Sequence, residues 1–140
     1  MVIEQKITQD IINVAEQIQY CMQKEIMEKG IAIETNPSSN YLISTFRAYE
    51  KHPIIHWHNK GLTNDIGQLD ECPQLDVTIN TDDQSVFGTS LENEYALMAI
   101  ALEKAVDDDG NPMYKKDMIY DWLDEIREKG FTRCFRQRIR

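Results

Sequence analysis

Two adjacent carboxylates, Asp82 and Asp83, follow directly on a run of strand-forming residues, Val77 to Thr81. A strand fixes its backbone while the loop beyond it opens to solvent, and α/β barrels place their active-site groups at the carboxyl ends of strands for this reason. The position therefore indicates chemistry rather than packing. Adjacent aspartates after a strand also form turns or cap the next helix, and the pair taken alone favours that simpler role.

The residues around the aspartates outweigh the capping interpretation. Three blocks resemble, in the same order, the C-terminal signature of the adenosine deaminase family of zinc-dependent hydrolases: 33–40 (IETNPSSN), His52-Pro53, and 78–95 with its TINTDD, FGTSL and EY segments. The first block is similar to that family's preceding strand and its Pro-Ser-Asn turn. The resemblance covers roughly residues 27–102 and supports a catalytic role for the aspartate pair.

The resemblance implies an α/β fold, namely the C-terminal part, about the last two β/α units, of a (β/α)8 TIM barrel of the metal-dependent hydrolase type. Strands are expected near 31–34 and 75–81, and helices over 91–106 and 113–129. A complete barrel needs about 250 residues. Residues 1–140 are therefore expected to form a partial, helix-rich domain. Two strands alone leave unpaired edges, so another chain or an upstream N-terminal barrel segment is expected to complete the sheet.

Local patterns predict the remaining elements. Apolar residues at helical spacing over 7–29 predict a helix that stops at Gly30. Residues 45–60 are also helix-like and stop before Gly61. Residues 62–73 are polar and rich in turn formers, and they are expected to form a loop.

In the resembled family, zinc is held by three histidines and one aspartate, and it activates a water that attacks C6 of a purine and releases ammonia. By that resemblance, Asp82 is the metal ligand, which also bonds to the attacking water. Asp83 is the substrate-binding residue, which accepts or shares a proton with purine N7 and holds the base in place, and both aspartates count as catalytic. Adenosine, deoxyadenosine, an adenine nucleotide and an adenine within RNA all stay open as substrates.

The family's histidine ligands belong to earlier strands of the barrel, which this sequence does not contain. His56 and His58 have the spacing of the family's H-x-H pair. However, residues two apart on a helix point about 200° away from each other, which favours a surface or packing role for both. His52 is expected to be structural because Pro53 restricts its backbone. The chain on its own is therefore expected to be inactive.

Several positions near the two strands depart from the family or have more than one interpretation. The Pro37 to Asn40 turn either lines the mouth of a pocket or satisfies its own backbone, and the direction of Glu34 stays open. Asn36 stands where many members have cysteine, and Gln84 where proline usually follows the aspartates. Residues 62–74 are longer than the connection in compact members, which favours a large, insertion-bearing bacterial relative of the divergent kind linked to anti-phage defence.

The composition disfavours nucleic acid and membranes as partners. The net charge is −9 and the pI about 4.7, whereas binding to a phosphate backbone requires clustered Lys and Arg. A basic C-terminal run is the exception and is expected to be a solvated or partner-facing helix end: Arg133, Arg136, Arg138 and Arg140. No leader or bilayer-length apolar stretch is present, and Cys21, Cys72 and Cys134 form no disulfide or metal pattern. These features predict a cytoplasmic protein with reduced cysteines.

A second hypothesis comes from a different class of protein. The chain could be a non-catalytic interaction or assembly subunit derived from the same fold, because fold resemblance never establishes activity by itself. The cytidine-type base deaminases can be set aside, since their H-x-E and P-C-x-x-C motifs do not occur.

Overall fold

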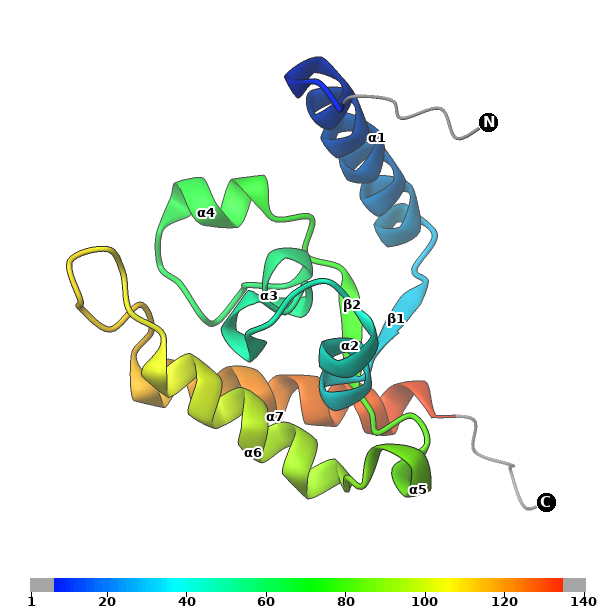
Figure 1. Cartoon of the computed structure of the whole chain (residues 1–140), viewed down its shortest axis with the longest axis vertical. Helices are drawn as coiled ribbons and strands as arrows, with labels where there is room; N and C mark the ends of the chain where they lie inside the picture. The colour runs from blue at the N-terminus through cyan, green and yellow to red at the C-terminus, as the bar shows by residue number, and fades with distance from the viewer. Residues whose placement is uncertain (1–6, 135–140) are drawn as a thin grey trace.

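The computed structural model describes residues 7–134, and its centre is a two-stranded parallel sheet (Figure 1). Strand β1 (Ala32–Thr35) pairs with β2 (Asp76–Ile79), so that Ala32 lies opposite Asp76 and Thr35 opposite Ile79. The backbone N–H of Asn80 donates to the Thr35 carbonyl at 2.8 Å, which extends the pairing beyond β2. The sequence-predicted strands overlap these two elements, and the second is shorter than the expected 75–81.

Most of the remaining described chain is helical. The helices are α1 (Gln9–Glu28), α2 (Pro37–Ile43), α3 (Ile54–Trp57), α4 (Ile66–Glu71), α5 (Gln84–Phe87), α6 (Leu91–Lys104) and α7 (Lys116–Arg133), with a 3-10 helix η1 (Tyr49–Lys51). Helices α6 and α7 lie side by side, and α7 packs along β2. Helix α1 extends away from the remaining elements in Figure 1.

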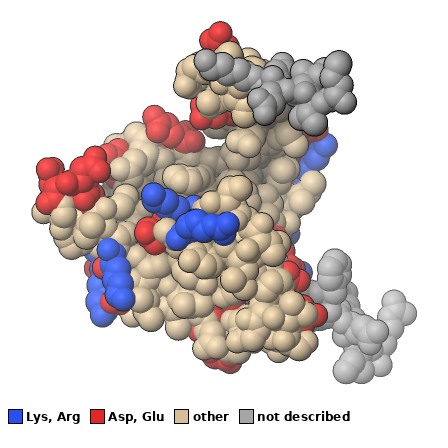
Figure 2. All heavy atoms as spheres, in the orientation of Figure 1, with Lys and Arg blue, Asp and Glu red and all other residues tan. Residues whose placement is uncertain are grey.

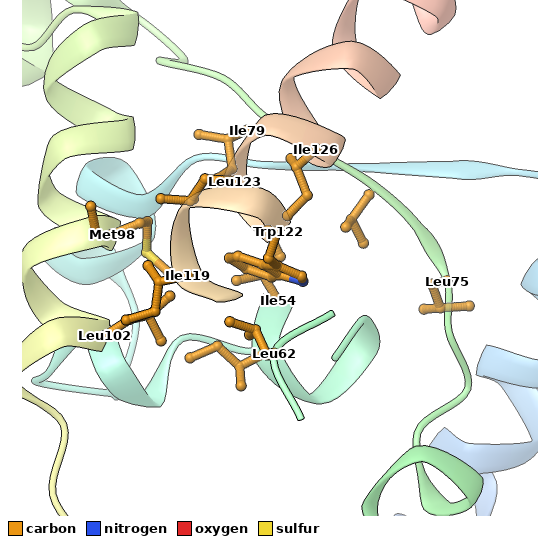
Figure 3. Close-up of a cluster of buried hydrophobic side chains, with 13 residues drawn as sticks. Ile54, Leu62, Leu75, Ile79, Met98, Leu102, Ile119, Trp122, Leu123 and Ile126 are labelled. Carbon is orange, nitrogen blue, oxygen red and sulfur yellow. The ribbon is translucent and has the colours of Figure 1, made fainter. Parts of the chain in front are cut away.

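The hydrophobic core lies between the helices and one face of the sheet (Figure 3). Trp122 of α7 is fully buried at its centre and donates its indole N–H to the His58 carbonyl at 3.1 Å. Val77 and Ile79 contribute the β2 side of this core, so Thr78 between them points to the opposite face of the sheet. Glu34 of β1 lies opposite Thr78 in the parallel pairing. Glu34 belongs to that opposite face and is exposed, which settles the direction that the sequence left open.

Two sequence predictions about local structure are wrong. The helix expected over 45–60 is replaced by η1 and α3, because His52 adopts an extended backbone (φ −64°, ψ 135°) before Pro53 and breaks the helical run. The loop expected over 62–73 contains α4. Its N-cap is Asp65, whose carboxylate accepts hydrogen bonds from two backbone N–H groups and so stabilises a short helix.

The remaining helix boundaries differ from the expected ones by a few residues. Helix α1 lies within the predicted 7–29 and ends before Gly30, which adopts φ +63° as a helix stop does. Helix α6 ends at Lys104 rather than 106, and α7 begins at Lys116 rather than 113. Helix α7 also continues through Gly130 to Arg133.

Helix α1 buries none of its residues, although it is amphipathic. Ile11, Val14, Ile18 and Met22 are all exposed, and only Ile26 near the C-terminal end of the helix packs against the core. Within residues 7–134, no helix is long and apolar enough to cross a membrane.

Replacing Trp122 with alanine is expected to lower the free energy of unfolding by about 3–5 kcal/mol, because it leaves a cavity at the centre of the core. Urea denaturation of the chain measures this loss. Trp122→Phe is the matched control, since it keeps an aromatic ring and loses mainly the hydrogen bond to His58, worth about 1 kcal/mol. Equal stability of the wild type and Trp122→Ala would contradict this placement of the core.

Candidate functional site

Asp82 lies just beyond the carboxyl end of β2 and has an unusual backbone. Its φ is +56°, a left-handed conformation that few residues other than glycine adopt and that Asp tolerates better than most. One carboxylate oxygen, Oδ2, accepts a hydrogen bond from the Ser39 hydroxyl at 2.8 Å. The other oxygen, Oδ1, has no hydrogen-bond partner among residues 7–134. The aspartate is thus held by one oxygen and keeps the other available.

Ser39 belongs to the first turn of α2, the helix that follows β1. The predicted Pro37 to Asn40 turn is therefore the start of a helix, with Pro37 at a position where its missing N–H costs nothing. Ser39 is 1% exposed, and the Asn40 side chain accepts from the Asn36 backbone N–H at 3.1 Å. The turn satisfies its own backbone, which is one of the two interpretations left open by the sequence, and it also brings a buried hydroxyl to Asp82.

Asp83 is the N-cap of α5, which is the simpler role weighed for the pair. Its Oδ1 accepts from the backbone N–H groups of Ser85 and Val86 at 3.0 Å each and from the Ser85 hydroxyl at 2.7 Å. The Ser85 hydroxyl, followed by the Val86 N–H, lowers the pKa of the Asp83 carboxyl below its usual value. Asp83 is exposed, and its second oxygen has no hydrogen-bond partner in the described part of the chain.

Glu94 is a fully buried carboxylate that sequence reasoning did not single out for a role. Its Oε2 accepts from the Ser38 backbone N–H at 2.8 Å, and its Oε1 accepts from the Thr89 hydroxyl. Ser38 precedes Ser39 on α2, whereas Thr89 precedes α6. The partners are 56 residues apart in the sequence in one case and five in the other, so only the nearer contact could have been inferred from spacing.

His52 has a structural role, as the sequence predicted. It is 1% exposed, and its Nδ1 accepts from the Ile54 backbone N–H at 3.2 Å. The ring proton therefore lies on Nε2, which donates to the Asn40 side-chain oxygen at 3.1 Å. Burial lowers the pKa of His52 to about 4, so the ring is neutral at pH 7.

His56 and His58 do not form a metal pair. His56 is exposed, whereas His58 is buried against α7, with Nε2 at 2.9 Å from the Lys129 ammonium and 3.4 Å from a Glu125 oxygen. Burial, with the Lys129 charge second, lowers the pKa of His58. Within residues 7–134, no group of three or more His, Cys, Asp or Glu side chains could hold a metal ion.

The residues present nevertheless fit part of a metal centre, namely a single carboxylate ligand. A carboxylate whose one oxygen accepts a hydrogen bond and whose other oxygen is free has the arrangement of a metal ligand oriented by an outer partner. Asp82 with Ser39 provides this arrangement at the end of β2. A complete centre would take its other ligands from outside the described residues.

Acidic side chains outnumber basic ones in the chain, 24 to 15. Figure 2 shows acidic side chains gathered over the loop between α6 and α7, where Asp107, Asp108 and Asp109 are exposed. Arg133 pairs with Asp76, and the other arginines of the basic run lie outside the described residues. Cys21, Cys72 and Cys134 are free thiols.

Comparison with known proteins gives a consistent set of relatives. The family model described as "Adenosine deaminase" matches residues 12–129. An aminodeoxyfutalosine deaminase of Streptomyces avermitilis is 33% identical over 56% of this chain and 18% of its own length. An adenosine deaminase of Pectobacterium atrosepticum is 33% identical over 56% of this chain and 19% of its own length.

An adenine deaminase of Rhizobium rhizogenes is 29% identical over 73% of this chain and 27% of its own length. The chain thus spans between 18% and 27% of the length of these three relatives. No solved structure matches the chain.

The neutral, buried His52 is expected to make the protein less stable as the pH falls. Its pKa of about 4 in the folded chain is below the ordinary 6.5, so the unfolded chain binds the proton first and stability is lost between about pH 6.5 and 4. The loss is about 3 kcal/mol when complete. Urea denaturation at pH 7 and pH 5 measures it, with His52→Gln as the variant that lacks this titration. An identical pH dependence in both proteins would contradict the assignment.

Proposed function

The chain belongs to the adenosine deaminase family, and on this premise we propose that it is the C-terminal part of a zinc-dependent purine deaminase that hydrolyses the amino group from purine C6. The fold of this family is a TIM barrel of the metal-dependent hydrolase type, and its members generally use a metal, typically zinc. The chain supplies the last two β/α units, and the rest of the barrel comes from a segment outside it. We call the assembly of both the completed protein.

The observation that carries this proposal is the Asp82 carboxylate at the end of β2. Parallel strands bring their carboxyl ends to the same edge of a sheet, and barrel enzymes place their active sites at that edge. Ser39 from the β1 end and Asp82 from the β2 end meet there through a hydrogen bond of 2.8 Å. A buried hydroxyl that orients a carboxylate at this edge supports an active-site role for Asp82.

Each aspartate has a separate role in the proposed reaction. Asp82 would hold zinc through its free Oδ1 while Ser39 holds Oδ2, and it would also orient the attacking water. Zinc, when bound, lowers the pKa of that water so that hydroxide is available at neutral pH. Asp83 keeps one oxygen for its capping bonds, and its other oxygen shares a proton with purine N7, which fixes the base against the water.

The surfaces of the chain support its completion by further barrel strands. Both outer edges of the β1–β2 sheet lack a strand partner within residues 7–134. Exposed parallel edges of this kind are normally covered. Helix α1 exposes an apolar stripe, and the relatives are several times longer than this chain. Adenosine, adenine and aminodeoxyfutalosine are the compounds in the relatives' names, so a purine nucleoside, base or nucleotide is the proposed class of substrate.

A non-catalytic assembly subunit is the second candidate, favoured by a surface groove between α6 and α7. The groove has a volume of about 550 Å³ and is lined mainly by apolar side chains, among them Leu91, Ile100, Tyr120 and Phe131. These four side chains are between 43% and 50% exposed, as on a surface that docks a partner.

Asp82→Ala is expected to remove bound zinc from the completed protein and to reduce ammonia release from adenosine to background, because the metal loses its carboxylate ligand. Elemental analysis and a coupled ammonia assay measure the two effects. Asp70→Ala, which changes an exposed aspartate of α4, is the matched control. Full zinc content and full activity in Asp82→Ala would favour the assembly subunit.

The 140-residue chain alone is expected to bind no zinc tightly and to release no ammonia from adenosine, since the described residues contain a single candidate ligand at the site. Equilibrium dialysis with zinc and the same ammonia assay provide the measurement. Stoichiometric zinc binding with enzyme-like turnover by the isolated chain would refute the proposed division of the site.

A further inference from the structure

We infer that Glu94 is a positioning residue, which sets the Asp82 carboxylate by tying together the loops at the ends of β1 and β2. The inference rests on the proposed function, because its consequence is the affinity of Asp82 for a metal. Glu94 itself lies on α6 and makes no direct hydrogen bond to Asp82.

A continuous series of contacts leads from Glu94 to Asp82. Glu94 Oε2 accepts from the Ser38 backbone N–H at 2.8 Å, and the next residue, Ser39, donates from its hydroxyl to Asp82 Oδ2 at 2.8 Å. Ser38 and Ser39 are both buried in the first turn of α2, where the backbone is fixed by helical geometry. A displacement of Ser38 would therefore move the hydroxyl that holds Asp82.

The second oxygen of Glu94 fixes the other end of the Asp82 loop. Oε1 accepts from the Thr89 hydroxyl, and Thr89 closes the segment that begins after β2 and contains both aspartates. The start of that segment is fixed by the bond from Asn80 N–H to the Thr35 carbonyl. Asp82, with its left-handed backbone, thus lies in a loop that is fixed at both ends, and the hydrogen bond from Ser39 fixes its side chain.

A carboxylate at the position of Glu94 is not explained by packing alone. Glu94 is 0% exposed, and no Lys, Arg or His within residues 7–134 forms an ion pair with it. A buried carboxylate without a cation is costly, and an apolar side chain would fill the same space at lower cost. Its two acceptor oxygens are the feature that an apolar side chain lacks, and both are used to hold a loop.

The test measures metal affinity of the completed protein with Co²⁺ as a spectroscopic probe and Zn²⁺ in competition. Glu94→Ala is expected to weaken metal binding by up to about 10-fold, the lower end of the effect of losing a direct partner of a metal ligand, and to change the visible Co²⁺ spectrum. Glu94→Gln is expected to restore affinity to near that of the wild type. Its amide can accept from Ser38 N–H and donate to the Thr89 hydroxyl, which retains the hydrogen bonds without the charge. Glu92→Ala removes an exposed carboxylate from the same helical turn and is expected to leave binding unchanged.

Far-UV circular dichroism and thermal unfolding show whether Glu94→Ala is folded. A folded Glu94→Ala with the affinity and spectrum of the wild type overturns the inference. If Glu94→Ala does not fold, Thr89→Val and Thr89→Ser decide, because they differ in the hydroxyl that donates to Glu94. Weaker binding in the valine variant alone supports the inference, and equal binding in both overturns it.

Failure of the proposed function gives a different result. A completed protein that binds no Co²⁺ or Zn²⁺, or one in which Asp82→Asn binds as tightly as the wild type, overturns the proposed function and the inference together. Metal binding that depends on Asp82 but not on Glu94 or Thr89 overturns the inference alone.

Discussion

The parallel pairing of β1 with β2 is the constraint on which the rest of the structure depends. It aligns Thr35 with Ile79, and so brings two loops that are more than forty residues apart to one edge of the sheet. The Thr35 hydroxyl donates to the Thr78 carbonyl at 2.7 Å in a buried position, which reinforces the register at that edge. A register shift by one residue would reverse the faces of Val77 and Ile79 and remove them from the core. The hydrogen bond between Ser39 and Asp82 is a consequence of this register.

The face of the sheet and the carboxyl ends of its strands differ in the contacts they make. Helices α6 and α7 cover one face, where Trp122 and Ile126 pack against β2. The carboxyl ends of the strands contain the polar contacts of Asp82, Ser39 and Glu94 instead. The far end of α7 is tied to the segment before β2 by the contact between Lys129 and His58. The apolar core therefore holds the strands, and the polar contacts lie at the edge where barrel enzymes place their active sites.

The sequence predicted those features that have local signals. The strand before the aspartate pair and the helix stop at Gly30 each depend on a few adjacent residues. The resemblance to the adenosine deaminase family is confirmed by the family match over residues 12–129. The break of the 45–60 helix at Pro53 and the Asp65 cap of α4 also have local signals, but the general helical and polar patterns obscured them. The contact of Glu94 with Ser38 has no local signal, since it joins residues that are 56 positions apart in the sequence.

The most direct test of the account is the position of the metal in a crystal of the completed protein, located by anomalous scattering at the zinc absorption edge. The account predicts a peak at about 2.0–2.2 Å from Asp82 Oδ1, the distance of a carboxylate ligand to zinc, with Ser39 still bonded to Oδ2. A zinc ion whose coordination shell excludes Asp82, or the lack of any zinc at the carboxyl ends of β1 and β2, would contradict it.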